Sequence, residues 1–423
     1  MATATRSVAE TCAAAKTASR VLARADSGTR DAALEAIATA LELRTAEILE
    51  ANGRDMEAGA EADIGSALLD RLKLTEERVA GIAADVRKIA ALPDPVGETI
   101  EGWRLPNGLD VRKVRVPLGV VAVVYESRPN VTIDCSALCL KSGNAIVLRG
   151  SSMASHSNAV LAGIARDAVA SVGLPADAVS LVAGGGREEL PELAGQEEYL
   201  DLIVPRGGEG LKKVLKEHAK VPVIYAASGN CHVFVDASAD LDDAVAITVN
   251  SKVQRPGVCN AAETLLVHSG VAAEFLPRAL RELRESGVEL RVDARTRELA
   301  GELAASLNDA TEEDWATEYL ALVLAVRVVD SVDEAIEHVT RYSSGHSEAI
   351  VTGSTESAQA FTEGVDAACV YVNASTRFTD GGQFQMGAEI GNSTQKLHAR
   401  GPIGVRELCT FKYVVEGSGQ VRS

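Results

Sequence analysis

Aromatic residues are scarce in this chain: Phe, Trp and Tyr together make up 4% of its 423 residues. Ala, Val and Leu must therefore build the core, which favours closely packed helices and parallel strands over an aromatic-rich all-β fold. Hydrophobic residues reach 46% and charged residues 24%, the composition of an ordinary globular protein. At roughly one domain per 150 residues, the length predicts two or three domains.

Basic residues are in deficit as well. The 42 Lys and Arg residues face 60 Asp and Glu residues, which gives a formal net charge of −18. So acidic a surface repels nucleic acid and anionic membranes, and we expect neither as a partner. The sequence also lacks a run of about 18 apolar residues and a signal-peptide pattern at its start, so it predicts no membrane span and no secretion.

The seven cysteines contain no Cys-x-x-Cys pair. Their odd number in a long chain argues against a disulfide framework or a structural zinc site and favours a reducing cytoplasm. Cys135 and Cys139 share a helix face without a third ligand, so we interpret them as packing residues and expect no metal.

Two patterns organise the first part of the chain. Apolar residues at helical spacing predict helices over 9–22 and 33–48, with a break and a cap at Asp26. Pro106-Asn-Gly lies between two strand-like segments, 103–105 and 109–116, and predicts a hairpin. Because an isolated ribbon is only marginally stable, we expect this hairpin to pair with another subunit.

From residue 117 onward, continuous apolar strands alternate with helices, which is typical of parallel, doubly wound α/β sheets. A first series of strands is expected at 119–125, 145–149, 179–183, 200–204 and 221–225. A second series is expected at 232–235, 263–267, 322–328, 349–352 and 368–372, with helices over 240–251 and 332–342 and a last strand near 408–415.

The segment around Cys259, Gln254-Arg-Pro-Gly-Val-Cys-Asn-Ala-Ala, is the most informative in the chain. A helix is expected to end near Ser251, Pro256-Gly257 forces a turn, and Cys259 should then begin a short helical turn. Backbone N–H groups, the helix dipole and nearby Arg255 would favour the thiolate, the nucleophile that forms a thioester. Taken alone, a cysteine among small residues is more often simply buried.

Longer blocks give this cysteine a context. The stretch 249–268 resembles the gamma-glutamyl phosphate reductases, the proline-pathway branch of the aldehyde dehydrogenase superfamily. Blocks 117–132, 141–150, 371–384 and 394–402 agree with the same family, in order and at natural spacing. The resemblance covers nearly the whole chain.

The resemblance implies an aldehyde dehydrogenase-like α/β fold, with two doubly wound parallel-sheet domains and a small β oligomerisation arm. We expect a cofactor-binding domain over 1–100 and 117–230, and a catalytic domain over 231–396. The arm would consist of the hairpin 101–116 and the C-terminal strand region 407–423.

The implied reaction is NADPH-dependent reduction of L-glutamyl 5-phosphate to L-glutamate 5-semialdehyde and phosphate, the second step of proline biosynthesis from glutamate. Cys259 would displace phosphate and carry the thioester. Its oxyanion needs donors, for which the Cys259 N–H and a side chain of loop 126–130 are candidates. That loop departs from the Trp-Asn-Phe-Pro type of motif, so Arg128 and Asn130 remain alternatives.

Hydrolytic members of the superfamily carry a Glu before the nucleophile domain as the base for deacylating water. The corresponding run here, 223–232, contains no acid. That absence is what a reductase predicts, since it must keep its thioester from hydrolysing.

The remaining site residues also follow from the resemblance. Cofactor contacts are expected from Arg149, Gly150, Ser151, Gly207, Gly208 and Glu318, and from the glycine turn at 184–187. An Arg at position 149 would meet a 2′-phosphate and favour NADPH, unless it is merely solvated. The anionic substrate would be bound by Ser375, Thr376, Arg377, Arg255 and Arg400.

Two alternatives stay open: another acylating aldehyde dehydrogenase of the same fold, or an inactive scaffold. The C-terminal signature and the missing acid favour the reductase over the first, and Cys259 argues against the second. Because the chain has no room for a glutamate kinase domain, we expect transient contact with a separate kinase that supplies the acyl phosphate. We also expect a homo-oligomer, either a dimer or a tetramer.

Overall fold

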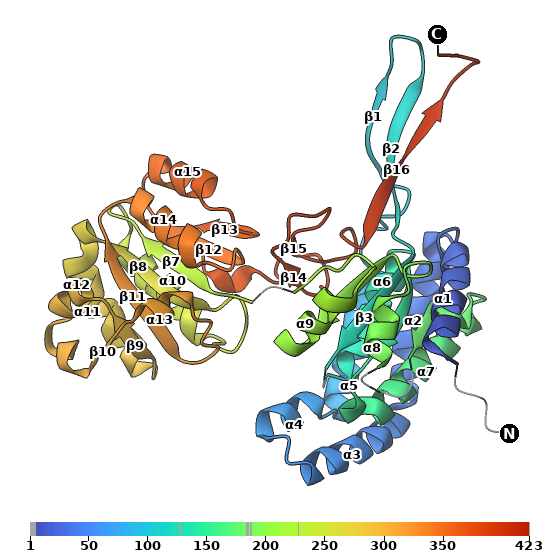
Figure 1. Ribbon diagram of the computed structural model, residues 1–423, viewed down its shortest axis with the longest axis horizontal. Helices are drawn as coiled ribbons and strands as arrows, with labels where there is room; N and C mark the ends of the chain where they lie inside the picture. The colour runs from blue at the N-terminus through green and yellow to red at the C-terminus, as the bar shows by residue number, and fades with distance from the viewer. Residues whose placement is uncertain (1–5, 127, 183–185, 187, 227, 423) are drawn as a thin grey trace. The chain divides into compact units, whose positions relative to one another are not determined.

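The computed structural model describes residues 6–126, 128–182, 186, 188–226 and 228–422 (Figure 1). The chain forms two compact units. Unit 1 comprises Met1–Ala226, Gln385–Gly391 and Ile403–Ser423, and unit 2 comprises Ala227–Phe384 and Asn392–Pro402. The segment Gln385–Gly391, which we expected in the second domain, therefore belongs to unit 1.

The N-terminal part of unit 1 is helical, as predicted. Asp26 is the N-cap of the second helix and accepts a hydrogen bond from the Thr29 N–H at 2.7 Å. The helix predicted over 33–48 is wrong in extent, because Arg44 leaves the helical conformation and the Thr45 hydroxyl donates to the carbonyls of Leu41 and Glu42. The helices are α1 Val8–Leu22, α2 Ser27–Leu43, α3 Thr45–Glu61, α4 Ser66–Leu72 and α5 Glu76–Ala90.

Unit 1 contains a four-stranded parallel sheet in the order β5-β4-β3-β6. Its strands are β3 Val120–Tyr125, β4 Ala145–Arg149, β5 Val179–Leu181 and β6 Leu202–Arg206, and its helices are α6 Asn130–Lys141, α7 Ser155–Ser171, α8 Glu189–Ala194 and α9 Glu209–His218. The expected strand at 221–225 is absent from the described residues there. Val223 makes one isolated bridge to Ile203, since Pro222 has no N–H to continue a ladder.

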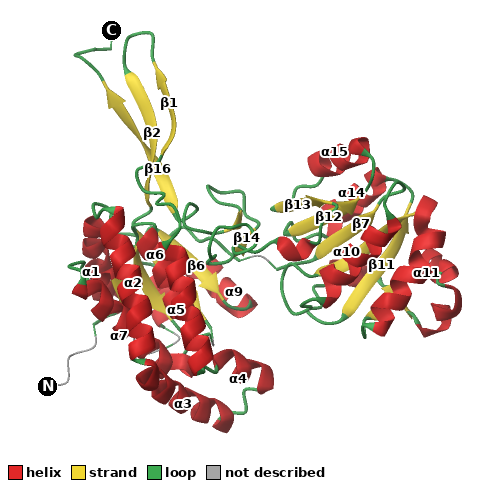
Figure 2. Ribbon diagram, turned by 180° about the vertical axis from the view of Figure 1, so that it is seen from behind, coloured by secondary structure: helices red, strands yellow, loops and turns green. Residues whose placement is uncertain are grey.

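The predicted hairpin is present. β1 Thr99–Arg104 pairs antiparallel with β2 Asp110–Pro117, which pairs antiparallel with β16 Cys409–Glu416. Figures 1 and 2 show these three strands projecting from the rest of unit 1 as an arm.

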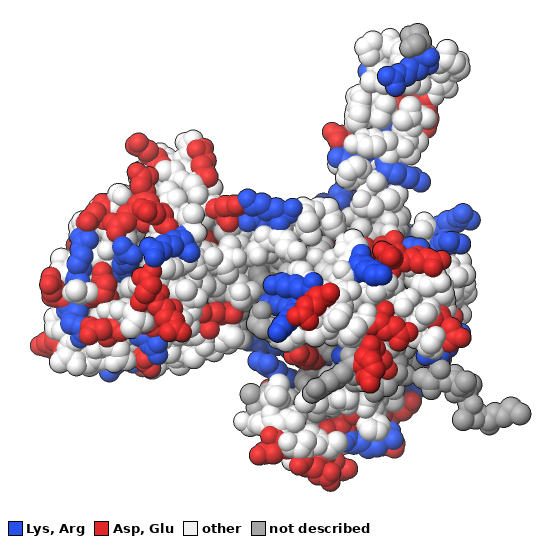
Figure 3. Space-filling model, viewed as in Figure 1, with Lys and Arg blue, Asp and Glu red and all other residues white. Residues whose placement is uncertain are grey.

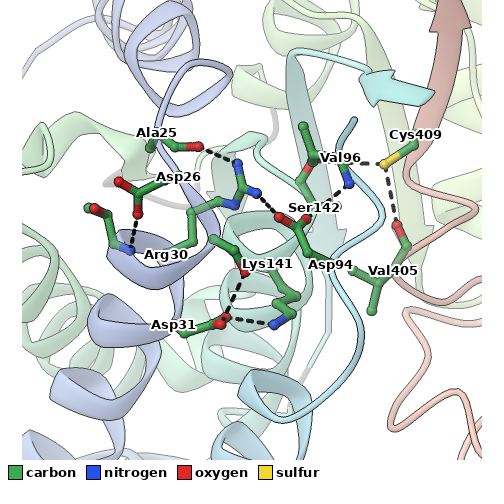
Figure 4. Close-up of polar contacts among 12 residues, drawn as sticks. Ala25, Asp26, Arg30, Asp31, Asp94, Val96, Lys141, Ser142, Val405 and Cys409 are labelled. Atoms are coloured by element: carbon green, nitrogen blue, oxygen red, sulfur yellow. Dashed lines mark hydrogen bonds and ion pairs between the residues drawn. The ribbon is translucent and has the colours of Figure 1, made fainter. Parts of the chain in front are cut away.

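Buried charges hold the segments at the root of this arm (Figure 4). Arg30 of α2 is 2% exposed and forms an ion pair with Asp94, in the loop that leads to β1. Lys141 of α6 donates to Asp31 at 2.6 Å and to the Ala90 carbonyl at 2.7 Å. The arm therefore starts from a backbone fixed by α2, α5 and α6.

Unit 2 contains a seven-stranded parallel sheet in the order β10-β9-β11-β8-β7-β12-β13. The strands are β7 Cys231–Val235, β8 Ala262–His268, β9 Glu289–Val292, β10 Asn308–Asp309, β11 Val323–Val329, β12 Ser347–Val351 and β13 Cys369–Val372. The helices are α10 Leu241–Val253, α11 Ser269–Glu285, α12 Ala294–Leu299, α13 Glu312–Ala316, α14 Val332–Tyr342 and α15 Thr355–Gly364. Two short strands, β14 Asn392–Ser393 and β15 Gly401–Pro402, form a separate pair.

The charges on the surface and the apolar content of the helices agree with the composition. Figure 3 shows acidic side chains interspersed with basic ones over the visible face, as a net charge of −18 leads one to expect. Within the described residues, no helix combines the length and the apolar character needed to cross a membrane.

Candidate active site

Cys259 lies on the turn that joins α10 to β8 and is partly exposed. Pro256 and Gly257 form the predicted turn, but no helix begins at Cys259. Cys259 does lie in a hydrogen-bonded turn, in which the Ala261 N–H donates to the Val258 carbonyl at 3.1 Å, but β8 starts at Ala262 and the turn does not continue as a helix. A helix dipole therefore does not support the thiolate.

Positive charge near Cys259 comes from two arginines instead. Arg255 precedes Cys259 on the same turn, and the Arg377 Nε donates to Gln254 Oε1 at 2.9 Å. The pKa of the Arg377 guanidinium is lowered from its ordinary value, first by burial and then by the charge of Arg255, while Asp380 and Cys259 act in the opposite direction. The two cations thus lie close enough to each other and to the thiol to interact electrostatically.

Ser375 and Thr376 fix the segment that carries Arg377. The Ser375 and Ser251 hydroxyls are 3.0 Å apart, which joins the segment to α10. Thr376 is fully buried, and its hydroxyl donates to the Asn260 carbonyl at 2.7 Å. The structure thus brings Ser375, Thr376, Arg377 and Arg255 together around Cys259.

Arg400 does not share these contacts. Its guanidinium donates to the Asp366 carboxylate at 2.8 Å and to the Asp366 carbonyl at 3.1 Å. The expectation that Arg400 binds substrate has no support in this arrangement.

Sequence reasoning did not identify the segment at 229–231 as part of the site. Gly229 lies so close to Cys259 that an added Cβ would be 1.5 Å from the Cys259 carbonyl oxygen. The Cys231 Sγ donates to that same oxygen at 3.2 Å. A Gly-Asn-Cys run directly before a buried strand was the only signal available, and it does not reveal which backbone the glycine meets.

Carboxylates reach this region from distant segments, although 223–232 has none. Glu318, expected at the nicotinamide ribose, accepts the Gly229 N–H at 2.6 Å. Glu263 is fully buried in an ion pair with Lys252. Glu348, also fully buried, accepts the His232 N–H at 2.8 Å. Each of these acids is held in a specific hydrogen bond rather than pointing into solvent as a ready base.

The predicted cofactor turn of unit 1 follows β4. The Arg149 guanidinium donates to the Gly186 carbonyl at 3.0 Å, and Ser151 accepts from the Met153 N–H. A Cβ at Gly150 would lie 2.1 Å from Asn158 Nδ2, so only glycine fits there. The other glycine turn, at 184–187, lies mostly outside the described residues.

The second predicted phosphate site differs from expectation. Gly207 and Gly208 precede α9, but the Glu126 carboxylate accepts the Gly208 N–H at 3.3 Å. A carboxylate thus lies where helix N–H groups would receive a phosphate. Phosphate binding at this point requires the Glu126 side chain to move.

Arg128 and Asn130 lie at the start of α6 in unit 1. Arg128 is exposed, and Asn130 Nδ2 donates to Asp134 Oδ2 at 2.8 Å. Cys259 belongs to unit 2, so the oxyanion role of these two residues stays a prediction.

Known proteins are similar to this chain in sequence and fold. The sequence profile of the Aldehyde dehydrogenase family matches residues 1–297 and 308–414. A gamma-glutamyl phosphate reductase of Thermobifida fusca (strain YX) is 54% identical over 417 residues, which are 99% of each chain. One from Moorella thermoacetica is 54% identical over 408 residues, covering 96% of this chain and 97% of that protein.

A solved structure agrees. The crystal structure of gamma-glutamyl phosphate reductase from Thermotoga maritima superposes with a TM-score of 0.96 at 47% identity, covering 99% of this chain and 100% of that one. The expected fold class and resemblance are confirmed. The chain belongs to the aldehyde dehydrogenase family, a family of oxidoreductases, and within it to the gamma-glutamyl phosphate reductases.

Proposed function

We propose that this protein reduces L-glutamyl 5-phosphate to L-glutamate 5-semialdehyde and phosphate with NADPH, through a thioester on Cys259. The observation that carries the proposal is a cysteine nucleophile on one turn with Arg255, with Arg377 held against that turn by hydrogen bonds to Gln254 and Asn260. The substrate has both a phosphate and a carboxylate, which two arginines are suited to bind. Relatives that carry the name of this reaction support the assignment.

The chemistry begins at the thiolate of Cys259. Its sulfur attacks the acyl carbon, the bond from that carbon to the phosphate oxygen breaks, and phosphate leaves with the electron pair. Arg255 and Arg377 neutralise the departing charge, and Arg128 or Asn130, with the Cys259 N–H, would stabilise the oxyanion. NADPH, when bound, would supply the hydride that reduces the thioester to the aldehyde level. The carbon–sulfur bond then breaks and the thiolate is restored.

The residues present fit a nicotinamide cofactor in part. The space that a Cβ at Gly150 would fill is occupied by the Asn158 side chain, so this glycine serves the packing of the turn after β4. Arg149 at that strand end is suited to a 2′-phosphate, and Glu318 to a ribose hydroxyl. The start of α9 fits a phosphate only after Glu126 has left the Gly208 N–H.

Protection from water supports reduction over hydrolysis. The residues at 223–232 include no acid, and the nearby Glu263 and Glu348 are fully buried in hydrogen bonds. Deacylation by water would need a carboxylate free to take its proton.

The proposed pathway, location and kinase partner follow from the same reaction. This step belongs to proline biosynthesis from glutamate, which suits a cytoplasmic enzyme. Acyl phosphates hydrolyse readily, so a separate glutamate kinase would pass its product on during transient contact. We also propose that the arm joins copies of the chain in a homo-oligomer.

The reverse reaction tests the proposal. Glutamate semialdehyde, NADP and inorganic phosphate should give NADPH absorbance, and omission of phosphate should abolish it. Cys259→Ala should lose this activity, while Cys139→Ala, which removes a fully buried thiol in α6, should keep it. Phosphate-independent NADP reduction, or full activity in Cys259→Ala, would contradict the mechanism. Activity with coenzyme A in place of phosphate would indicate a different acylating aldehyde dehydrogenase.

A further inference from the structure

The backbone of Cys259 is held from several sides by residues of unit 2. The Cys231 thiol donates to its carbonyl at 3.2 Å, and the next carbonyl, that of Asn260, accepts from the Thr376 hydroxyl at 2.7 Å. Asn260 Nδ2 in turn donates to the Thr379 carbonyl at 2.8 Å. Hydrogen bonds thus tie the main chain of Cys259 and the residue after it to β7 and to the segment 376–379.

The segment that carries Cys231 is itself rigid. Gly229 packs on the Cys259 backbone with no room for a Cβ, and its N–H is held by Glu318 at 2.6 Å. The Asn230 side chain donates to the carbonyls of Trp315 at 2.7 Å and Tyr342 at 2.8 Å. The Cys231 thiol is therefore presented from a fixed support.

The sheet is irregular next to Cys231. β7 and β8 pair in parallel, but Cys231 is opposite Ala262 while His232 is opposite Thr264, so the register skips Glu263. The extra residue belongs to β8, and the irregularity lies between the Cys259 turn and the regular part of the sheet. Burial raises the pKa of the Cys231 thiol well above its ordinary value, and Glu348 and Cys259 add to this, so Cys231 keeps its proton and remains a donor.

We propose that Cys231 is a positioning residue for Cys259, whose thiol holds the Cys259 carbonyl and so keeps the nucleophilic sulfur in one reactive orientation. The effect on turnover rests on the proposed function; the effect on the thiol itself does not. Positioning matters because an error of about 1 Å at a reacting atom can cost about 100-fold in rate.

Three substitutions separate hydrogen bonding from packing. Cys231→Ala removes the donor and leaves a space, Cys231→Val removes the donor and fills the space, and Cys231→Ser keeps a donor. We expect Ala and Val to lower kcat about tenfold with KM within about twofold, and Ser to recover most of the rate. Cys139→Ala is the matched control for loss of a buried thiol. Equal kcat in all four variants overturns the proposal, as does a rate that falls with Ala but not with Val.

The rate of alkylation with iodoacetamide measures the reactivity of the Cys259 thiol without substrate or cofactor. Cys259 and Cys369 are partly exposed and the other five cysteines are buried, so Cys369 serves as the reference within each sample. Mass spectrometry of the two peptides should show Cys259 reacting several-fold more slowly, relative to Cys369, in Cys231→Ala and Cys231→Val than in Cys231→Ser or Cys139→Ala. An unchanged ratio overturns the proposal. If the ratio changes but the wild-type protein does not reduce NADP with semialdehyde and phosphate, the positioning role stands and the proposed reaction fails.

Discussion

Asp134, on α6 one turn from Asn130, shows how a single carboxyl can link pH to stability. Burial raises its pKa from the ordinary value of 3.8 to about 6, although the Asn130 hydrogen bond works in the other direction. The folded protein therefore disfavours the charged form. Below about pH 4 both folded and unfolded chains are protonated at this residue, and no penalty arises. Between about pH 4 and 6 the unfolded chain ionises first, so this residue lowers stability as pH rises.

Asp134→Asn should therefore stabilise the folded protein more at high pH than at low pH. Its side chain keeps an acceptor for Asn130 but carries no charge to desolvate. Thermal unfolding at pH 8 and pH 4 should show a higher Tm for the variant relative to wild type at pH 8, and a smaller difference at pH 4. Glu50→Gln, on an exposed position of α3, is the control and should show no such trend. The same difference at both pH values would contradict the cause given for Asp134.

At the scale of elements, Lys252 and Glu263 join the two segments on either side of the Cys259 turn. Lys252 lies in the last turn of α10, Glu263 is the second residue of β8, and both side chains are fully buried in one ion pair. Burial lowers the pKa of Lys252 and raises that of Glu263, while each partner works against the other's shift. A buried pair of this kind stabilises little by itself, but the loss of one partner leaves a desolvated charge.

The two single substitutions should therefore cost more stability, added together, than the double substitution. We expect Lys252→Met to lower the free energy of unfolding by about 3–5 kcal/mol, and Lys252→Met with Glu263→Gln to cost less than the sum of the two single changes. Denaturant unfolding of the four proteins measures this. Arg295→Met, at an exposed pair with Asp330, is the control and should cost under about 1 kcal/mol. Strictly additive costs would show that the pair is not coupled.

Elements with a local signal were predictable, and those without one were not. β3 is a continuous apolar run buried on both faces, β8 contains the apolar run Leu265-Leu-Val, and both strands were expected. β9 was missed because Glu289–Val292 alternates polar and apolar residues over only four positions. The run at 221–225 is apolar enough for a strand, but Pro222 interrupts its ladder.

The same distinction applies to the residues of the candidate site. Cys259, Arg255 and the 375–377 segment could be found because their motifs are contiguous in sequence. The approach of Gly229 to Cys259 could not, since residues 30 positions apart meet only through the pairing of β7 with β8.

At the scale of the whole molecule, the arm presents an aromatic surface. Trp103 of β1 and Phe411 and Tyr413 of β16 are 43%, 43% and 55% exposed. The ring centroids of Trp103 and Tyr413 are 6.2 Å apart, and those of Phe411 and Tyr413 are 5.7 Å apart. In a chain with 4% aromatic residues, such a cluster on an exposed three-stranded sheet is the basis of our proposal that another subunit covers this surface.

Substitution of these rings should weaken self-association without unfolding the chain. Aromatic residues at the centre of an interface often contribute about 2 kcal/mol each, so Trp103→Ser with Tyr413→Ser should together cost about 4 kcal/mol and raise the dissociation constant about 1,000-fold. Sedimentation over a range of concentrations measures that constant, and circular dichroism checks the fold. Lys412→Ser is the matched control, because neighbouring side chains on a strand point to opposite faces and Lys412 lies next to Tyr413 on β16. If the double variant keeps the assembly of the wild type while Lys412→Ser loses it, the opposite face of the arm forms the interface. If neither change alters the assembly, neither face of the arm forms the interface between subunits.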